Sequence, residues 1–319
     1  MTPNNGPVPH SLQGHSPART AKRLFLATRP MFFSALILPV ILGTAWGIRT
    51  AHSPDYVAFA IALLAAVFAH AAINVINDVY DDVCGTDPIN TDRIYPFTGG
   101  SRFIQEGIMT RQEMMRWGVV LLTSAALLGV GLVTIKGVGV IWFGLIGVAL
   151  GVLYSVPPIQ LSGHGLGEIA VGVGFGPLTV TGAAWLQSGQ VNAGAALLSL
   201  PISFWVFNVL LINEIPDAKA DAAAGRRTLV VRLGLQTTLV VYLVINVLAV
   251  LAIGLAVLQE LLPAFAISFP IILLVTATAA AWHMVSNAPH RSALTTGIKT
   301  TLAIHAAGAV WLISVVWPW

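Results

Sequence analysis

The chain has 319 residues, of which 56% are hydrophobic and only 9% are charged, and its mean hydropathy is +0.82. Soluble globular domains carry about a quarter charged residues, so this composition excludes a water-soluble domain and indicates a membrane protein with several crossings. The formal net charge of +3 does not indicate nucleic-acid binding, because the basic residues are scattered over segments that flank apolar runs.

The first 23 residues contain Pro, Gly and Asn and precede the apolar segments. They lack the apolar core and the small-residue cleavage site of a secretory signal. We therefore predict a flexible cytoplasmic tail over residues 1–23, followed by one membrane domain over residues 24–319. The single cysteine, Cys84, excludes an internal disulfide framework.

About 20 apolar residues are needed for a helix to cross a bilayer. Since lipid offers no partner to unpaired backbone groups, each such segment is predicted to be helical. Breaks at polar and Pro/Gly clusters give nine segments: 31–49, 57–80, 113–135, 138–155, 166–187, 194–216, 236–258, 262–284 and 299–317. The predicted fold is all-α, with nine transmembrane helices in one bundle around a central cavity that faces the cytoplasm.

The charged residues are distributed unevenly between the two sides of this predicted bundle. All Lys and Arg residues except Arg49 and Lys136 fall in the N-terminal tail or near the loops after the second, sixth and eighth segments. The positive-inside rule places this side in the cytoplasm, so the N-terminus is expected inside and the C-terminus on the opposite side. Acidic residues share the bias, with only Asp55 and Glu260 on the other face. The positive-inside rule does not predict this, and it indicates a function on the cytoplasmic face.

The second segment ends in the acidic stretch NVINDVYDD, residues 74–82. Asn74, Asp78 and Asp82 are spaced four apart and share one face if the helix continues. Asn77 and Asp81 form a second ridge beside them.

The sixth segment ends in a matching stretch, NEIPDAKAD, where Asn213, Asp217 and Asp221 repeat the spacing. Carboxylates stacked at about 4 Å repel by up to roughly 4 kcal/mol at an effective dielectric near 20, so they need protons, cations or a metal. Oxygen ligands without His or Cys favour Mg²⁺, which commonly bridges carboxylates to phosphates. The two stretches therefore predict a Mg²⁺-dependent site that grips a diphosphate.

The loop GTDPINTDRIYPFTGGSRFIQEG after the first stretch adds more polar groups. It contains Asp87, Asp92, Arg93 and Arg102, and its TGGS segment offers backbone amides that could meet an anion. Arginine is suited to bidentate phosphate binding.

Together, NDVYDD, GTD, DR and NEIPDAKADAAAGRRTLVVRLG resemble the signatures of the UbiA-type intramembrane aromatic prenyltransferases. The resemblance covers roughly residues 20–319. The GTD…DR…GGSR variant, with GLGEIAVGVGFGPL further on, is most similar to the 1,4-dihydroxy-2-naphthoate polyprenyltransferase branch of menaquinone synthesis. One departure is Pro158, which stands where many family members have a lysine four residues after a tyrosine, here Tyr154.

The resemblance implies Mg²⁺-dependent transfer of a polyprenyl group from a polyprenyl diphosphate to an aromatic acceptor within the bacterial inner membrane. It implies that catalysis depends on Tyr154 and on metal-binding aspartates: Asp78, Asp81, Asp82, Asp217 and Asp221. It implies diphosphate binding by Asn74, Asn77, Arg93, Arg102, Asn213, Lys219 and Arg226. The partners expected are these substrates and membrane lipid, with no nucleic acid and no obligate protein partner.

Two alternatives remain open at this stage. One is prenylation of another acceptor, of the 4-hydroxybenzoate or homogentisate type. The other is an ion-coupled transporter, a class in which membrane carboxylates and paired halves are common. The sequence leaves undetermined the prenyl chain length, the oligomeric state, and any role of Cys84, Glu168 or Arg29.

Overall fold

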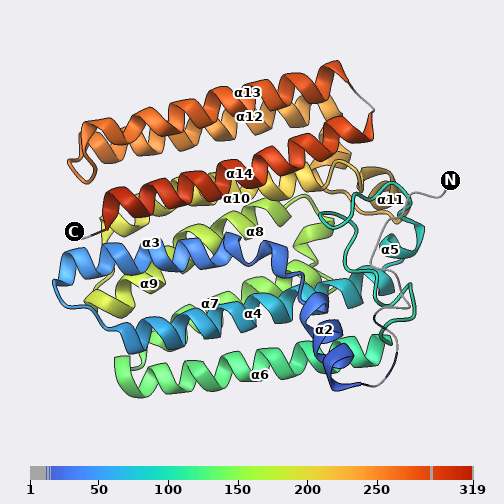
Figure 1. Cartoon of the computed structure of the whole chain (residues 1–319), viewed down its shortest axis with the longest axis horizontal. Coiled ribbons are helices and arrows are strands. Elements are labelled where there is room, and N and C mark those ends of the chain that lie inside the picture. The colour runs from blue at the N-terminus through green and yellow to red at the C-terminus, as the bar shows by residue number, and fades with distance from the viewer. Residues whose placement is uncertain (1–11, 13, 15, 288–289, 318–319) are drawn as a thin grey trace.

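A computed structural model of the chain describes residues 12, 14, 16–287 and 290–317. Over these residues the regular structure is entirely helical, and the long helices lie side by side in one bundle (Figure 1). The predicted all-α class is confirmed.

Eight spans in the described part of the chain are long and apolar enough to cross a membrane. Seven are built on single long helices: α3 (Ser34–Ala51), α4 (Tyr56–Val83), α6 (Arg111–Lys136), α10 (Ala193–Asn213), α12 (Leu229–Leu258), α13 (Ser268–Ser286) and α14 (Arg291–Val316). The eighth is composite and consists of α8 (Gly167–Val173), the π-helical turn η3 (Gly174–Leu178) and α9 (Thr179–Ser188).

The segment expected at 138–155 forms α7 (Gly139–Ser155), an apolar helix of 17 residues. At 1.5 Å per residue it is about 26 Å long, slightly less than the ~30 Å hydrocarbon core. It occupies the predicted place in the chain, but the count of nine crossings stays a prediction.

Helix ends differ from expectation where the local chemistry requires it. α4 runs to Val83 without interruption and is followed by Gly85 with φ of 80°, a left-handed conformation that suits glycine at a helix end. In contrast, α10 ends at Asn213 rather than near 216, because Pro216 has no N–H to continue the helix. α14 begins at Arg291 rather than near residue 299.

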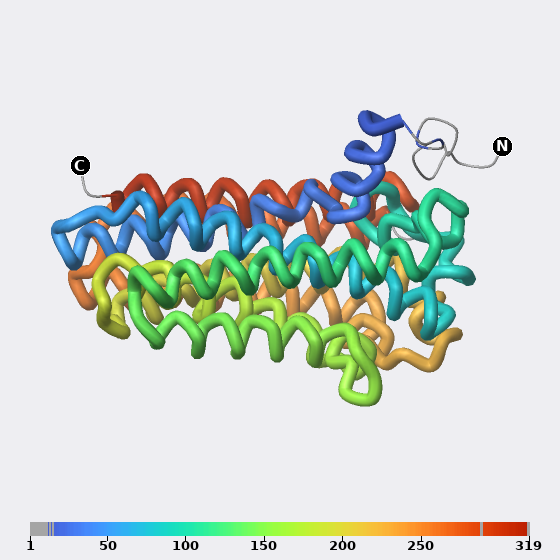
Figure 2. The backbone as a smooth tube through the Cα atoms, turned by 90° about the horizontal axis from the view of Figure 1, so that it is seen from below, coloured from blue at the N-terminus to red at the C-terminus, as the bar shows by residue number. Residues whose placement is uncertain are grey.

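The N-terminal region is only partly described, since residues 1–11, 13 and 15 of the predicted tail lie outside the described residues. From Pro17 to Ala27 the chain forms helix α2, so the predicted boundary at residue 23 falls inside a helix. Figure 2 shows α2 standing at an angle to the long bundle.

The two ends of the bundle differ in kind. At one end, α2 and the short helices α5 (Thr86–Ile89) and α11 (Ala218–Ala223) gather with long loops, while α14 finishes at the other end (Figure 1). One apolar core joins α3, α10, α12, α13 and α14 around Trp205 and Tyr242. A second core joins α4 and α6 around Val75 and Met114. Helices of both cores line a large cavity.

Candidate functional site

The cavity has a volume of about 880 Å³ and is lined by α3, α4, α6, α7, η3, α9, α10 and the loops at the α5/α11 end of the bundle. Its charged lining residues all lie at that end: Arg29, Asp81, Asp87, Glu214, Asp217, Asp221 and Arg226. Away from that end the lining is almost entirely apolar. The acidic residues of the two matching stretches are therefore brought together at one end of the bundle.

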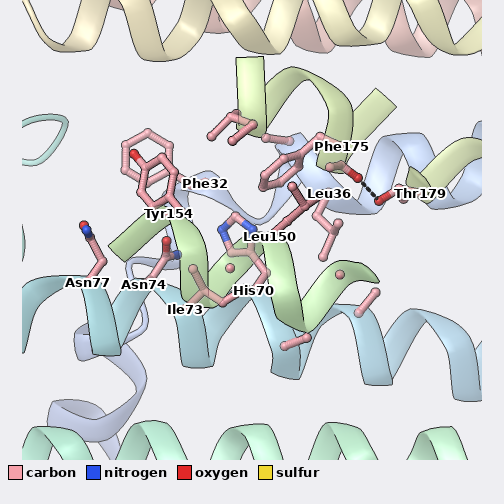
Figure 3. Close-up of a pocket in the computed structure, with 18 of the residues that line it drawn as sticks. Phe32, Leu36, His70, Ile73, Asn74, Asn77, Leu150, Tyr154, Phe175 and Thr179 are labelled. Atoms are coloured by element: carbon pink, nitrogen blue, oxygen red, sulfur yellow. Dashed lines mark hydrogen bonds between the residues drawn. The ribbon is translucent and has the colours of Figure 1, made fainter. Parts of the chain in front are cut away.

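On α4, the face that borders the cavity carries Asn74, Asn77 and Asp81, and Figure 3 shows Asn74 and Asn77 rising from that helix toward it. At 3.6 residues per turn, a residue seven positions on returns to about the same face, whereas one eight positions on is rotated by about 80°. Asp81 thus shares the face of Asn74, and Asp82 does not.

Asp82 instead binds side chains outside the cavity. Its carboxylate accepts hydrogen bonds from Arg111 Nε at 2.8 Å and Gln105 Nε2 at 3.0 Å. This ties the end of α4 to the start of α6 and the loop before it.

Arg226 links the two acidic stretches across the cavity. Its Nη1 donates to Asp81 Oδ1 at 2.9 Å, and its Nε lies 3.4 Å from Asp221 Oδ1. Although burial opposes the charge on Arg226, these two aspartates outweigh that effect and raise its pKa. Burial raises the pKa of Asp221 to about 7, although Arg226 acts in the opposite direction.

Asp217 accepts three hydrogen bonds from the loop that connects α5 to α6. Its Oδ1 accepts from Asn90 Nδ2 at 2.7 Å and Thr98 Oγ1 at 2.9 Å, and its Oδ2 accepts from the Gly99 amide at 2.9 Å. Burial raises its pKa, and these three bonds lower it in part. The TGGS amides therefore bind the protein's own carboxylates, and Ser101 N likewise donates to Asp78 Oδ2 at 2.9 Å.

Two buried carboxylate oxygens, Asp78 Oδ1 and Asp87 Oδ2, have no hydrogen-bond partner. Both oxygens lie close to Gly100: a Cβ on this residue would be 2.9 Å from Asp78 Oδ1 and 2.8 Å from Asp87 Oδ2. Gly100 has φ of 65°, a conformation that glycine adopts without strain. The nearest cation to Asp78 is Arg29, whose Nη1 is 3.6 Å from Oδ1. Burial, reinforced by Asp81 and Asp78, holds the pKa of Asp87 well above its usual range.

These features fit a divalent cation. The charged lining contains more carboxylates than guanidinium groups, two buried oxygens are unpartnered, and hard oxygen donors are those that Mg²⁺ prefers. Among the described residues, no three His, Cys, Asp or Glu side chains are already gathered for a metal. A cation held here would complete its shell with water and phosphate oxygens, as Mg²⁺ usually does.

Three of the predicted diphosphate-binding cations do not line the cavity. Arg93 is buried beside Glu106, and Arg102 Nη1 donates to the Asp87 carbonyl at 2.7 Å. The Lys219 side chain is 89% exposed and pairs with Asp92. Their predicted role stays a prediction, since Arg226 and Arg29 are the arginines that line the cavity in the described part of the chain.

Tyr154 and Asn213 line the cavity as expected, and beside them is a buried pair of acids that the sequence did not single out as a pair. Burial, together with the neighbouring Glu168, raises the pKa of Glu214 well above its usual range, so this pair of acids favours holding a proton. Sequence reasoning also missed Arg29, for which no sequence signal exists. The sequence did contain signals for two other cavity residues. Asp87 lies in the GTD motif, and Asp81 follows Asn74 and Asn77 at i, i+3, i+7 spacing on α4.

Beyond the acidic end, the cavity becomes an apolar groove floored by α4 from Ala69 to Ala62. From Asp81 to Ala62 the groove follows α4 for about 29 Å at 1.5 Å per residue. It opens sideways between α6 and α7, because the lining residues Val130 and Leu145 are 62% and 57% exposed.

Comparison with known proteins shows which family this chain resembles. The model of the UbiA prenyltransferase family matches residues 36–303. The 1,4-dihydroxy-2-naphthoate octaprenyltransferase of Escherichia coli (strain K12) is 33% identical over 213 residues, which cover 65% of this chain and 66% of that protein. The UbiA prenyltransferase domain-containing protein 1 of Xenopus tropicalis is 30% identical over 222 residues, which cover 68% of this chain and 61% of that protein. The matches thus span less than two thirds of the length of these relatives.

Solved structures share the fold. A UbiA homolog from Archaeoglobus fulgidus, bound to GPP and Mg²⁺, superposes with a TM-score of 0.64 at 16% identity, over 92% of this chain and 100% of that one. The family match over most of the chain confirms the prediction made from the acidic motifs: this chain belongs to the UbiA prenyltransferase family.

Proposed function

We propose that this protein transfers a polyprenyl group from a polyprenyl diphosphate to an aromatic ring, with 1,4-dihydroxy-2-naphthoate as the acceptor. The observation that carries the proposal is the continuity of one cavity, in which an acidic, oxygen-lined end runs into a long apolar groove. A polyprenyl diphosphate needs these two environments side by side. Naphthoate prenyltransferases among the relatives, at 28% and 33% identity, support the choice of acceptor.

Asp81, Asp87 and Asp221 line the acidic end and would hold Mg²⁺, and the unpartnered oxygen of Asp78, which is buried beside this end, could join them. Mg²⁺ would neutralise the diphosphate and stabilise it as a leaving group. Asp217 acts indirectly by fixing Asn90 and Thr98 of the loop. Arg29 and Arg226 are placed to bind diphosphate oxygens, and Asn74, Asn77 and Asn213 border the same space.

In the proposed reaction, the bond between the first prenyl carbon and the diphosphate oxygen breaks, and its electron pair leaves with the diphosphate. The resulting allylic cation is attacked by the ring carbon that carries the carboxylate. The carboxylate then departs as CO₂ and returns its bonding electrons to the ring. The Tyr154 ring borders the cavity between the acidic end and the groove and can stabilise the cation, while the apolar groove excludes water that would otherwise capture it.

The test is to purify the full chain in detergent and supply Mg²⁺, a prenyl diphosphate and a panel of acceptors: dihydroxynaphthoate, 4-hydroxybenzoate and homogentisate. We expect prenylated dihydroxynaphthalene with release of CO₂, and no product when EDTA removes the metal. Product only with another acceptor would refute the naphthoate assignment. No product with any acceptor would refute the proposed activity.

A further inference from the structure

The apolar groove contains a polar side chain that the proposed reaction does not use and that no protein group among the described residues satisfies. His70, on α4, lines the cavity, is 9% exposed, and its Nε2 has no hydrogen-bond partner. A buried polar group without a partner is costly, and such groups in native proteins are nearly always bonded. A hydrocarbon tail cannot supply the missing bond, so His70 indicates a second, polar ligand in the groove.

The surroundings of His70 indicate what kind of ligand this is. The imidazole is held edge-on between Phe33, at a centroid distance of 5.8 Å, and Phe175, at 5.1 Å. Phe32 and Tyr154 line the same region, and Figure 3 shows all of them except Phe33 around one space. Aromatic rings pack favourably against such faces and edges. By contrast, the α6 and α7 sides of the groove present small residues such as Ala126, Gly129 and Gly144.

The position of His70 fits a molecule that meets the prenyl donor at the acidic end. His70 lies four residues before Asn74, which is one helical turn of about 5.4 Å along the α4 axis. A two-ring aromatic with its ring substituents is longer than one turn. It can therefore place one ring carbon beside Asn74 and Tyr154, where the first prenyl carbon would lie, and a ring substituent at His70.

Resting on the proposed function, we infer that His70 recognises the acceptor: its free ring nitrogen hydrogen-bonds a hydroxyl group of a hydroxylated, two-ring aromatic. The imidazole selects for hydroxylated rings, the phenylalanines hold the flat body of the ring system, and the small-residue side of the groove is left for the prenyl tail. His70 is thus a specificity-determining residue for the acceptor and has no part in gripping the diphosphate.

The test compares His70→Leu with His70→Gln, which restores a hydrogen-bonding group at a similar reach. His305→Leu is the matched control, because His305 is also buried with unpartnered ring nitrogens but does not line the cavity. Steady-state kinetics of the full chain with Mg²⁺ should show the KM for acceptor raised about tenfold or more in His70→Leu. The KM for donor should be unchanged in His70→Leu. His70→Gln should recover part of the lost acceptor affinity, and the KM values of His305→Leu should match those of the parent protein.

A second measurement uses two inhibitors, 1-hydroxy-2-naphthoate and 2-naphthoate, which differ by one hydroxyl. The parent protein should bind the hydroxylated compound about tenfold more tightly, and His70→Leu should lose this preference. A preference that survives in His70→Leu, or a change confined to the KM for donor, would overturn the inference.

Binding of an unreactive prenyl thiolodiphosphate with Mg²⁺ separates the two proposals. If the parent protein binds the analogue and forms product, but His70→Leu keeps its preference for the hydroxylated inhibitor, only the proposed role of His70 is refuted. If the parent protein neither binds this analogue nor forms product, the proposed function falls and the inference falls with it.

Discussion

Individual carboxylates at the acidic end differ in what their oxygens already bind. Asp82 is held by Arg111 and Gln105 outside the cavity, and Asp217 has both oxygens engaged by the loop. Asp81 faces the cavity opposite Arg226, while one oxygen each of Asp78 and Asp87 is unpartnered. Equal spacing in the sequence therefore does not mean equal availability to a metal and a diphosphate.

The adjacent pair Asp81 and Asp82 gives the sharpest test of this difference. We expect Asp81→Asn to lower kcat/KM by about 100-fold or more, because it removes a charge that faces the leaving group. Asp82→Asn should lower it by less than about tenfold, since it loosens a contact outside the cavity. Steady-state assays with saturating Mg²⁺ measure both, and circular dichroism checks that each variant is folded. The reverse order of effects would contradict the assigned faces of α4.

The pH dependence should follow Asp221. Its pKa is raised to about 7 by burial, with Arg226 lowering it and Asp217 and Asp81 raising it further. Mg²⁺ needs the ionised carboxylate, so below pH 7 a proton must leave before the cation binds. The Mg²⁺ concentration for half-maximal activity should therefore fall by up to about tenfold per pH unit as pH rises toward 7 and then level off. Asp221→Asn should flatten this profile, and an identical profile in that variant would exclude Asp221 as its source.

At the scale of helices, α6 and α7 leave one side of the groove unfilled. Gly129 on α6 and Gly144 on α7 both line the cavity, and a Cβ at either would meet nothing within 4 Å. From Tyr154 to Gly144 the distance along α7 is about 15 Å. A five-carbon prenyl unit spans about 5 Å, from four carbon–carbon bonds of ~1.5 Å, so the fourth unit of a tail would have to pass Gly144.

We predict that Gly144→Leu or Gly129→Leu shortens the range of donors used. kcat/KM should fall at least about tenfold for donors of four or more units and change little for a two-unit donor, because only long tails meet the new side chain. Gly131→Leu is the control, since Gly131 lies on α6 with Gly129, has open space around it and does not line the cavity. Competition among donors of graded length measures the effect. Equal losses for short and long donors would show that the tail does not follow this groove.

For the molecule as a whole, the acidic end and the end of α14 lie on opposite sides of the bundle (Figure 1). The distribution of Lys and Arg predicts that the acidic end faces the cytoplasm. Cysteine labelling tests this in a Cys84→Ser background. Thr91→Cys lies in an exposed loop at the acidic end, and Ser53→Cys lies in the exposed connection between α3 and α4 at the other.

With an impermeant maleimide, intact cells should label only Ser53→Cys, and inverted membrane vesicles only Thr91→Cys. Labelling of both from one side would contradict the crossing pattern. The opposite pattern would reverse the proposed orientation.

The sequence by itself determined the class of protein, the approximate places of its helices, the clustering of its acids at one end and its family. These properties depend on local composition and on short motifs, which are readable without the fold. It also predicted that α4 and α10 would carry matching polar stretches. The equivalence was incomplete, because α10 stops before Pro216 and leaves Asp217 and Asp221 on a turn and the separate helix α11.

Only the tertiary structure decided which of these residues share the cavity. Rotation about a helix axis separates Asp81 from its neighbour Asp82, and a hydrogen bond between Thr98 and Asp217, 119 residues apart, closes the loop over the acidic end. Arg29 reaches Asp78, and His70 reaches the groove, through packing between helices. Such contacts depend on which helix faces each side chain, and spacing along a single chain does not specify that.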